Sequence, residues 1–284
     1  DVTNSGTISA ADDKAIDIYR SSDATITNNS GATITSVGNT IRTGGSSSDS
    51  STGYTITNSG KIYSTSSGGK SSAIFGNANS SGGTITNNSG AEIYSGGNVA
   101  TIRVGGTTAI TNRGSIKNNA STSDNVIELL GSDNTVTLKE GSILVGKISS
   151  GSGTSGNTLK LNLGAGQGYF YETVGEFTLQ DLDGNQVVKG SAGSVGQGGS
   201  ETLDELLSYK SLNLREFFKK YKNSENFNEN NSWGETYAAH SSRGAHTANL
   251  ALQYDLINFG ANLISPSDNS NFVLAFEGGI QGFA

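Results

Sequence analysis

The chain has 284 residues but contains no cysteine, no methionine and only one proline. The lack of cysteine excludes disulfides, zinc–thiolate sites and a cysteine nucleophile. Charged residues make up 15% of the chain, against about 25% in a typical soluble domain. The net charge of −7 argues against nucleic acid as a partner, and no apolar run reaches the ~18 residues that a transmembrane helix needs.

The chain is instead rich in small and polar residues, with 40 glycines and many serines, threonines and asparagines. Glycine at this level with almost no proline excludes a collagen helix, which needs abundant proline and a glycine at every third position. Disordered chains are usually charged or proline-rich, and this chain is neither. With hydrophobic residues at 33%, the composition predicts an all-β protein with a narrow core and many turns.

A short motif built around Ile-Thr-Asn, a glycine and a second isoleucine recurs through the first half of the chain. Its asparagines stand at positions 4, 28, 58, 87 and 112, which gives spacings of 24, 30, 29 and 25 residues. A sixth, degenerate copy has Leu138 in place of the asparagine. Each period holds about three short alternating strands, which is the signature of a β-solenoid. We therefore predict a parallel β-helix of about six to seven coils that share one core.

Each copy predicts a strand followed by a turn. Side chains alternate along a strand, so Ile26 points inward while Thr25 and Thr27 point outward. Asparagine suits the turn because its amide bonds to the backbone, and stacked coils place these amides in a ladder at ~4.8 Å intervals. The alternative is that the asparagines only form turns and face solvent. The predicted ladder consists of Asn28, Asn58, Asn87 and Asn112.

A second, shorter apolar element lies between the copies. If its apolar ends face the core, its middle residues form an outward column. Opposite charges in neighbouring coils then help to set the register, at ~0.2–1 kcal/mol per exposed pair. The alternative is a ligand-binding stripe centred on Phe75. The predicted column consists of Asp17, Arg42, Phe75, Arg103 and Glu128.

The two longest periods contain extra residues, which we assign to segments 44–53 and 76–83. Insertions in solenoids form loops, often on the binding face. These two loops are therefore candidate contact sites, and the alternative is that they are passive solvated excursions.

The repeat fades after residue 145, and bulkier residues such as Tyr169, Phe170 and Phe177 appear. A solenoid needs an atypical end that covers its last coil. A Gly/Ser-rich linker follows, then one convincing helix and weakly alternating segments that are typical of membrane β-barrel strands. The predicted parts are solenoid repeats over 1–145, a solenoid cap over 146–190, a linker over 191–199, an α-helix over 200–223 and partial β-barrel strands over 224–284.

This order of parts resembles an autotransporter of the type V secretion class of Gram-negative bacteria. The similarity covers essentially the whole chain by organisation, and its most specific sequence features lie at 141–146, 157–159, 233–235 and 249–250. The resemblance implies a solenoid passenger at the cell surface, a helix that threads the barrel pore, and strands that begin the translocator. Only about four strands fit after residue 224, fewer than a complete barrel needs.

No catalytic, metal or cofactor site is predicted. Both histidines, His240 and His246, lie beyond the solenoid, which excludes a Ser-His-Asp triad within residues 1–230. A polysaccharide-active β-helix enzyme, which would use neighbouring aspartates, is the weakest functional alternative. The two aspartate pairs of the chain lie in expected turns, at Asp12 with Asp13 and at Asp181 with Asp183.

Two functions from different classes remain. The first is a non-enzymatic adhesive or structural passenger that contacts other cell surfaces or glycans, with its C-terminal strands in the outer membrane. The second is a self-assembling filament or sheath subunit, whose copies join through unpaired coil edges. The first coil begins within a repeat, and its expected open edge contains Val2, Thr3 and Thr7. Both functions place the protein outside the cell, at the bacterial outer-membrane surface.

Overall fold

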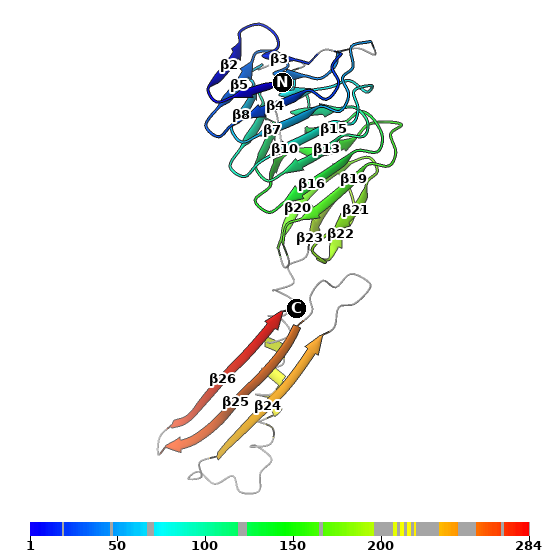
Figure 1. Cartoon of the computed structure of the whole chain (residues 1–284). Helices are drawn as coiled ribbons and strands as arrows, with labels where there is room; N and C mark the ends of the chain where they lie inside the picture. The colour runs from blue at the N-terminus through cyan, green and yellow to red at the C-terminus, as the bar shows by residue number, and fades with distance from the viewer. Residues whose placement is uncertain are drawn as a thin grey trace. The chain divides into compact units, whose positions relative to one another are not determined.

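The structure is a computed structural model, and it describes residues 1–195 apart from 19, 46–47, 67–70, 119–123 and 165–166. Beyond residue 195 it describes a few positions between 207 and 219 and the three strands that lie within 233–283. The chain divides into two compact units, and Figure 1 shows their elements. One unit comprises Asp1–Asp183 and Val187–Val195, and the other comprises Gly184–Gln186 and Gly196–Ala284.

The first unit is an all-β parallel solenoid, as the repeat period predicts. Each of its six complete coils contributes one strand to each of three sheets, which we call sheets A, B and C. Sheet A contains β1 (Val2–Asn4), β4 (Thr25–Asn28), β7 (Thr55–Asn58), β10 (Thr84–Asn87), β13 (Ala109–Asn112), β16 (Thr135–Lys139), β19 (Thr158–Asn162) and β21 (Thr178–Asp181). Sheet B contains β2 (Thr7–Ala10), β5 (Thr33–Ser36), β8 (Lys61–Ser64), β11 (Glu92–Ser95), β14 (Ser115–Asn118) and β17 (Ile143–Val145).

Sheet C is parallel over most of its length and ends in an antiparallel cap. Its parallel strands are β3 (Ile16–Asp17), β6 (Ile41–Arg42), β9 (Ile74–Phe75), β12 (Ile102–Val104), β15 (Asn125–Leu129), β18 (Lys147–Ser150) and β20 (Tyr169–Val174). The strand β23 (Ala192–Val195) then pairs antiparallel with both β20 and β22 (Val187–Val188). Because an antiparallel strand cannot continue the coil, this arrangement ends sheet C.

The core is a set of isoleucine stacks that run from coil to coil. In sheet A, Ile26 pairs with Ile56, which pairs with Ile85, which pairs with Ile110. None of these side chains is more than 1% exposed. Burial of one such side chain stabilises the fold by roughly 1.5–3 kcal/mol. A single coil cannot bury its own inner face, so this stabilisation depends on stacking.

The boundary that we predicted at residue 145 is a boundary in the sequence motif but not in strand pairing. Leu159 and Leu161 of β19 pair in parallel with Val136 and Leu138 of β16 and are fully buried. β21 then pairs in parallel with β19. Stacking requires only alternating apolar residues and a free strand edge, so the solenoid continues into the segment that we assigned to the cap.

The position of the extra residues also differs in part from our prediction. The segment between β6 and β7 is long, as expected, and its Thr52 forms isolated parallel bridges to Ser22 and Ser81 in the neighbouring coils. In the next coil, however, the link between β8 and β9 is as long as the link between β9 and β10. The sequence excess of that period is therefore shared between two corners.

The second unit contains a three-stranded antiparallel sheet of β24 (Trp233–Arg243), β25 (Tyr254–Ser267) and β26 (Ser270–Phe283). Of the roughly four strands that we expected over 224–284, the structure describes these three. Most of the helix predicted over 200–223 lies outside the described residues. Within the described part of the chain, no helix has the length and apolar character that crossing a membrane requires.

Candidate functional site

The asparagines of the repeat form a buried hydrogen-bonded ladder. Asn28, Asn58, Asn87 and Asn112 are 0% exposed, so they do not face solvent. The Nδ2 atoms of Asn28, Asn58 and Asn87 each donate to the Oδ1 atom of the asparagine in the next coil, at 2.8–2.9 Å. Asn4 extends this ladder in the first coil, where its Nδ2 donates to Asn28 at 2.9 Å. The ladder is thus a structural device that joins coils.

The ladder does not stop where the motif degenerates. Leu138 stands in the strand position of the missing asparagine, and its side chain is buried in the core. The amide of Asn112 donates instead to the Oγ atom of Ser142, at 2.6 Å. This hydroxyl lies in the turn that follows β16. A serine four positions after Leu138 therefore serves as the acceptor in place of the missing asparagine.

Two further asparagines stack on each other at the corner that directly precedes the strands of sheet A. Asn134 donates from Nδ2 to Oδ1 of Asn157 at 3.0 Å, and both side chains are buried. Asn157 in turn donates to the Oγ atom of Ser150 at 2.9 Å. This pair was not predicted from the sequence, although both asparagines directly precede an alternating strand.

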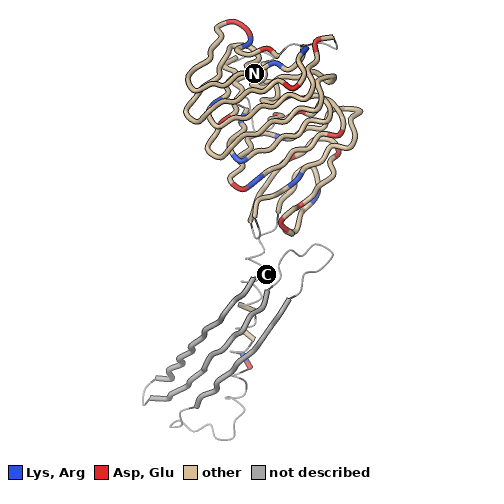
Figure 2. Tube along the Cα trace, in the orientation of Figure 1, with Lys and Arg blue, Asp and Glu red and all other residues tan. Residues whose placement is uncertain are grey.

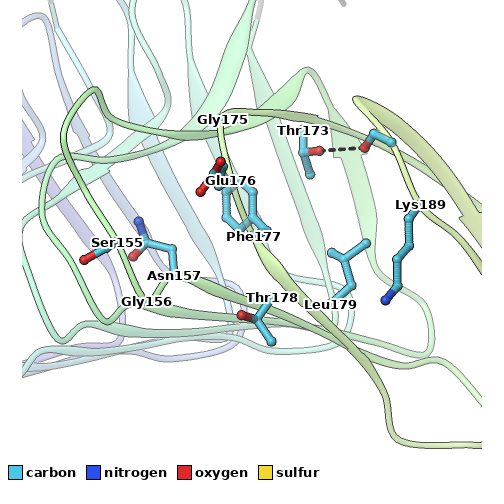
Figure 3. A pocket seen from close by; sticks show the side chains of 11 residues that line it. Ser155, Gly156, Asn157, Thr173, Gly175, Glu176, Phe177, Thr178, Leu179 and Lys189 are labelled. Atoms are coloured by element: carbon cyan, nitrogen blue, oxygen red, sulfur yellow. Dashed lines mark hydrogen bonds between the residues drawn. The ribbon is translucent and has the colours of Figure 1, made fainter.

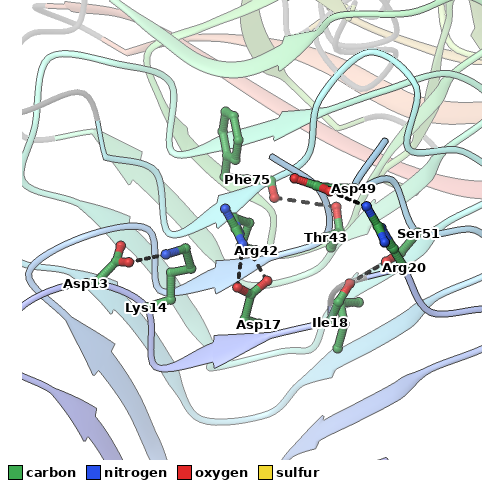
Figure 4. A network of polar contacts seen from close by, with 10 residues as sticks. All are labelled: Asp13, Lys14, Asp17, Ile18, Arg20, Arg42, Thr43, Asp49, Ser51 and Phe75. Carbon is green, nitrogen blue, oxygen red and sulfur yellow. Dashed lines mark hydrogen bonds and ion pairs between the residues drawn. The ribbon is translucent and has the colours of Figure 1, made fainter. Parts of the chain in front are cut away.

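The predicted outward column is present as an in-register row on sheet C. Asp17 pairs with Arg42 along the backbone, then Phe75, Arg103 and Glu128 follow in successive coils. Arg42 donates from Nε and Nη2 to the carboxylate of Asp17, at 3.0 and 2.5 Å, as Figure 4 shows. These bonds raise the pKa of Arg42.

The remaining residues of the column also contact one another. Arg103 donates from Nε to Glu128 at 2.6 Å, and its guanidinium lies 5.6 Å from the centre of the Phe75 ring. Half-exposed contacts of this kind contribute ~0.2–1 kcal/mol each. Because the charged groups pair with one another, the column acts as a register device, and a ligand stripe centred on Phe75 is not favoured.

Sheet B presents a similar self-paired group. Tyr63 donates to the carboxylate of Glu92 at 2.5 Å, and Lys117 donates to the same carboxylate at 3.4 Å. The hydrogen bond from Tyr63 lowers the pKa of Glu92, and Lys117 adds to the effect. The group therefore stabilises the fold above the ordinary glutamate pKa, and this contribution is lost as pH falls through the lowered value.

The outer face of sheet A differs because four successive strands, β4, β7, β10 and β13, present threonines there and no charged residue. Side chains on this face alternate with the buried isoleucines and form two in-register columns of threonines, one of them interrupted by Ala109, and we call this surface the threonine face. Among the described residues, none of these hydroxyls forms a hydrogen bond, and β4, β7, β10 and β13 carry no charge. Figure 2 shows how sparse charge is along the coils. The threonine face comprises Thr25, Thr27, Thr55, Thr57, Thr84, Thr86, Thr111, Thr135 and Thr137.

The residues of the expected open edge lie on β1 and β2, which are edge strands of sheets A and B. Val2 pairs with Ile26, Thr3 with Thr27 and Thr7 with Thr33. On the other side of β1, the described residues contribute no further strand to sheet A.

A hollow of about 520 Å³ lies near the last coils and is drawn in Figure 3. Phe177, Glu176 and Lys189 line it, together with two buried polar side chains. Both of these already have partners, since Thr173 donates to the carbonyl of Gly190 at 3.2 Å and Asn157 is bound as described above. The hollow therefore offers a ligand few buried polar groups.

The described residues contain no group of three or more histidine, cysteine, aspartate or glutamate side chains that could hold a metal ion. Asp13 pairs with its neighbour Lys14, and Asp183 accepts hydrogen bonds from Asn162 and the backbone of Gly164. Comparisons with known proteins add no assignment, since no family model, curated protein sequence or solved structure matches the chain.

Proposed function

We propose that the chain is a non-enzymatic adhesive or structural β-helix, displayed at a bacterial cell surface as an autotransporter passenger. The observation that carries the proposal is the threonine face. Two columns of unpartnered hydroxyls and methyls run along one sheet, whereas charged groups on the other two sheets bind their neighbours. A surface of this kind makes many weak polar contacts with another surface, and such contacts become strong through multivalency.

The order of the chain supports the autotransporter part of the proposal. A parallel solenoid precedes a separate unit with three long antiparallel strands. That order is the one in which a passenger and the first translocator strands follow each other. The wider proposal also fits the low charge of the coils, because an uncharged face adheres with little dependence on salt.

The threonine face can be tested by valine substitutions, which keep the side-chain shape and remove the hydroxyl. Beads coated with the protein would be scored for retention on epithelial cells and on glycan-coated plates. We expect Thr57→Val with Thr86→Val to lower retention about tenfold, because multivalent binding amplifies each lost contact.

The matched control is Thr33→Val with Thr35→Val on the outer face of sheet B, where retention should stay unchanged. Circular dichroism would verify that all variants fold. Equal retention of both double variants would contradict a role for the threonine face, and turnover of a polysaccharide by the purified chain would contradict a non-enzymatic function.

A second candidate function is assembly through the first coil, and it is favoured by β1, which is an edge strand of sheet A among the described residues. Sheet A also has an edge at its other end, on β21.

Assembly predicts filaments that lengthen with protein concentration in electron micrographs, with ~4.8 Å order along the axis. Thr3→Pro should abolish them, because proline on an edge strand removes a hydrogen-bond donor. Discrete particles at every concentration would rule out this candidate and leave the adhesive proposal in place.

A further inference from the structure

A second hollow, which we call the corner hollow, lies where the chain turns from sheet A toward sheet B. Its volume is about 610 Å³. Sites for small ligands usually have volumes of ~300–1,000 Å³. The polar side chains that line it are Ser89, Arg113, Lys139, Glu140, Asn162 and Asp183.

Coil register brings two cations to one side of the corner hollow. Asn112 pairs with Leu138, so Arg113 and Lys139 are the next residues of adjacent coils. Lys139 then pairs with Asn162 in the following coil. The backbones of successive positions lie ~4.8 Å apart, so both cations can reach the same anionic group.

No described carboxylate forms an ion pair with either of these two cations. Six other cations of the solenoid do pair with a carboxylate, in most cases one from an adjacent coil, whereas Lys61, Lys160 and Lys189 do not pair with a described one. The paired cations are Lys14, Arg20, Arg42, Arg103, Lys117 and Lys147. No described carboxylate therefore competes with an anionic ligand for Arg113 and Lys139.

Across the corner hollow, a carboxylate is held in place by neutral donors. Asp183 accepts from Nδ2 of Asn162 at 3.0 Å and from the backbone N–H of Gly164 at 3.0 Å. Its own backbone N–H donates to Asp181 at 2.9 Å, which fixes the turn. An ionised carboxylate has about four acceptor positions, so Asp183 can accept further hydrogen bonds. The exposed Glu140 adds a second set of acceptors.

We propose that the corner hollow binds an acidic sugar of a glycan, such as a uronic or sialic acid residue. The carboxylate of the sugar binds to Arg113 and Lys139, and its hydroxyls donate to Asp183 and Glu140. Arginine suits this role because its planar fork matches a carboxylate. Among the described residues that line the hollow there is no aromatic ring, so it lacks the apolar surface on which a neutral sugar would stack.

This inference rests on the proposed function, because it names the ligand class to which the adhesive passenger binds. Isothermal titration of the full chain would compare two acidic probes, trigalacturonic acid and sialyllactose, with the neutral probes maltotriose and lactose. We expect at least one acidic probe to bind about tenfold more tightly than its neutral counterpart, with an affinity that falls as salt rises. Equal affinity for the acidic and neutral probes would overturn the proposal.

The decisive variant is Arg113→Ala with Lys139→Ala, which should weaken binding of the acidic probe about tenfold or more. Its control is Lys160→Ala with Lys189→Ala, which removes the same net charge from residues outside the corner hollow and should leave affinity within about twofold. Equal losses in both double variants would mean that the effect is non-specific attraction, and the proposal would be wrong.

The bead assay separates this inference from the proposed function. If beads adhere through the threonine face while no acidic sugar binds, the corner hollow is not the ligand site and the adhesive function stands. If acidic sugar binds but valine substitutions on the threonine face change nothing, adhesion depends on the corner hollow alone. If neither the beads adhere nor any sugar binds, both proposals fail.

Discussion

Asn58→Ala should destabilise the solenoid by about 3–4 kcal/mol, because several buried polar groups lose their partner at once. The side chain of Asn58 is 0% exposed. Its Nδ2 donates to Asn87, to the carbonyl of Gly60 and to the carbonyl of Glu92, at 2.9–3.2 Å. Its Oδ1 accepts from Asn28 and from the backbone N–H of Gly60. Each buried group left without a partner costs about 1–3 kcal/mol, and partial relaxation reduces the sum.

The measurement is the urea midpoint of unfolding followed by circular dichroism. Asn88→Ala is the matched control, because Asn88 is half-buried and makes a single side-chain bond, to Ser59 at 2.8 Å. The control should lose no more than about 1 kcal/mol. Equal shifts of the midpoint in the two variants would show that the ladder does not stabilise the coils more than an ordinary turn contact.

Gly60→Ala should lower the stability of the solenoid by a similar amount, although the substitution adds only one methyl group. A β-carbon at Gly60 would lie 2.6 Å from the carbonyl oxygen of Asn29 and would overlap the carbonyl oxygen of Ala32. Both atoms are backbone atoms of the preceding coil, so relief requires the two coils to move apart. We expect a loss of about 2–4 kcal/mol in unfolding free energy.

The first coil supplies an internal control for this substitution. Gly6 follows Asn4 at the same distance as Gly60 follows Asn58, but a β-carbon at Gly6 would meet no atom within 4 Å. Gly6→Ala should therefore change stability by less than about 0.5 kcal/mol. A loss in Gly6→Ala as large as in Gly60→Ala would point to an effect on the unfolded chain and not to close packing of coils.

The repeat makes much of this fold predictable from sequence. A strand motif that returns at nearly constant spacing must stack on itself, so equivalent residues meet in adjacent coils. For this reason the ladder from Asn28 to Asn112 and the column from Asp17 to Glu128 follow from the spacing of the motif alone. The outward position of Thr57 follows from the same alternation. The two ion pairs within the column, Asp17 with Arg42 and Arg103 with Glu128, also follow from opposite charges in neighbouring coils.

The end of the solenoid is harder to predict because stacking does not need the motif. Leu161 pairs with Leu138 without any asparagine turn, since buried apolar side chains and a free edge are sufficient. The antiparallel turn of β23 onto β20 depends on contacts between segments that share no repeat. The loss of the motif after residue 145 therefore marks the end of the stacked coils too early.

The sequence by itself determined the coil, its period and which residues stack. Alternation and spacing are local properties of the sequence, and their repetition places equivalent residues opposite one another in adjacent coils. Only the tertiary structure decided which polar groups remain available. Stacking sets most residues of the threonine face beside other threonines and none beside a charged partner in β4, β7, β10 or β13, and their hydroxyls form no hydrogen bond among the described residues. The corner hollow brings Arg113, Lys139 and Asp183 together from three coils, and no spacing in the sequence specifies the turns that position them.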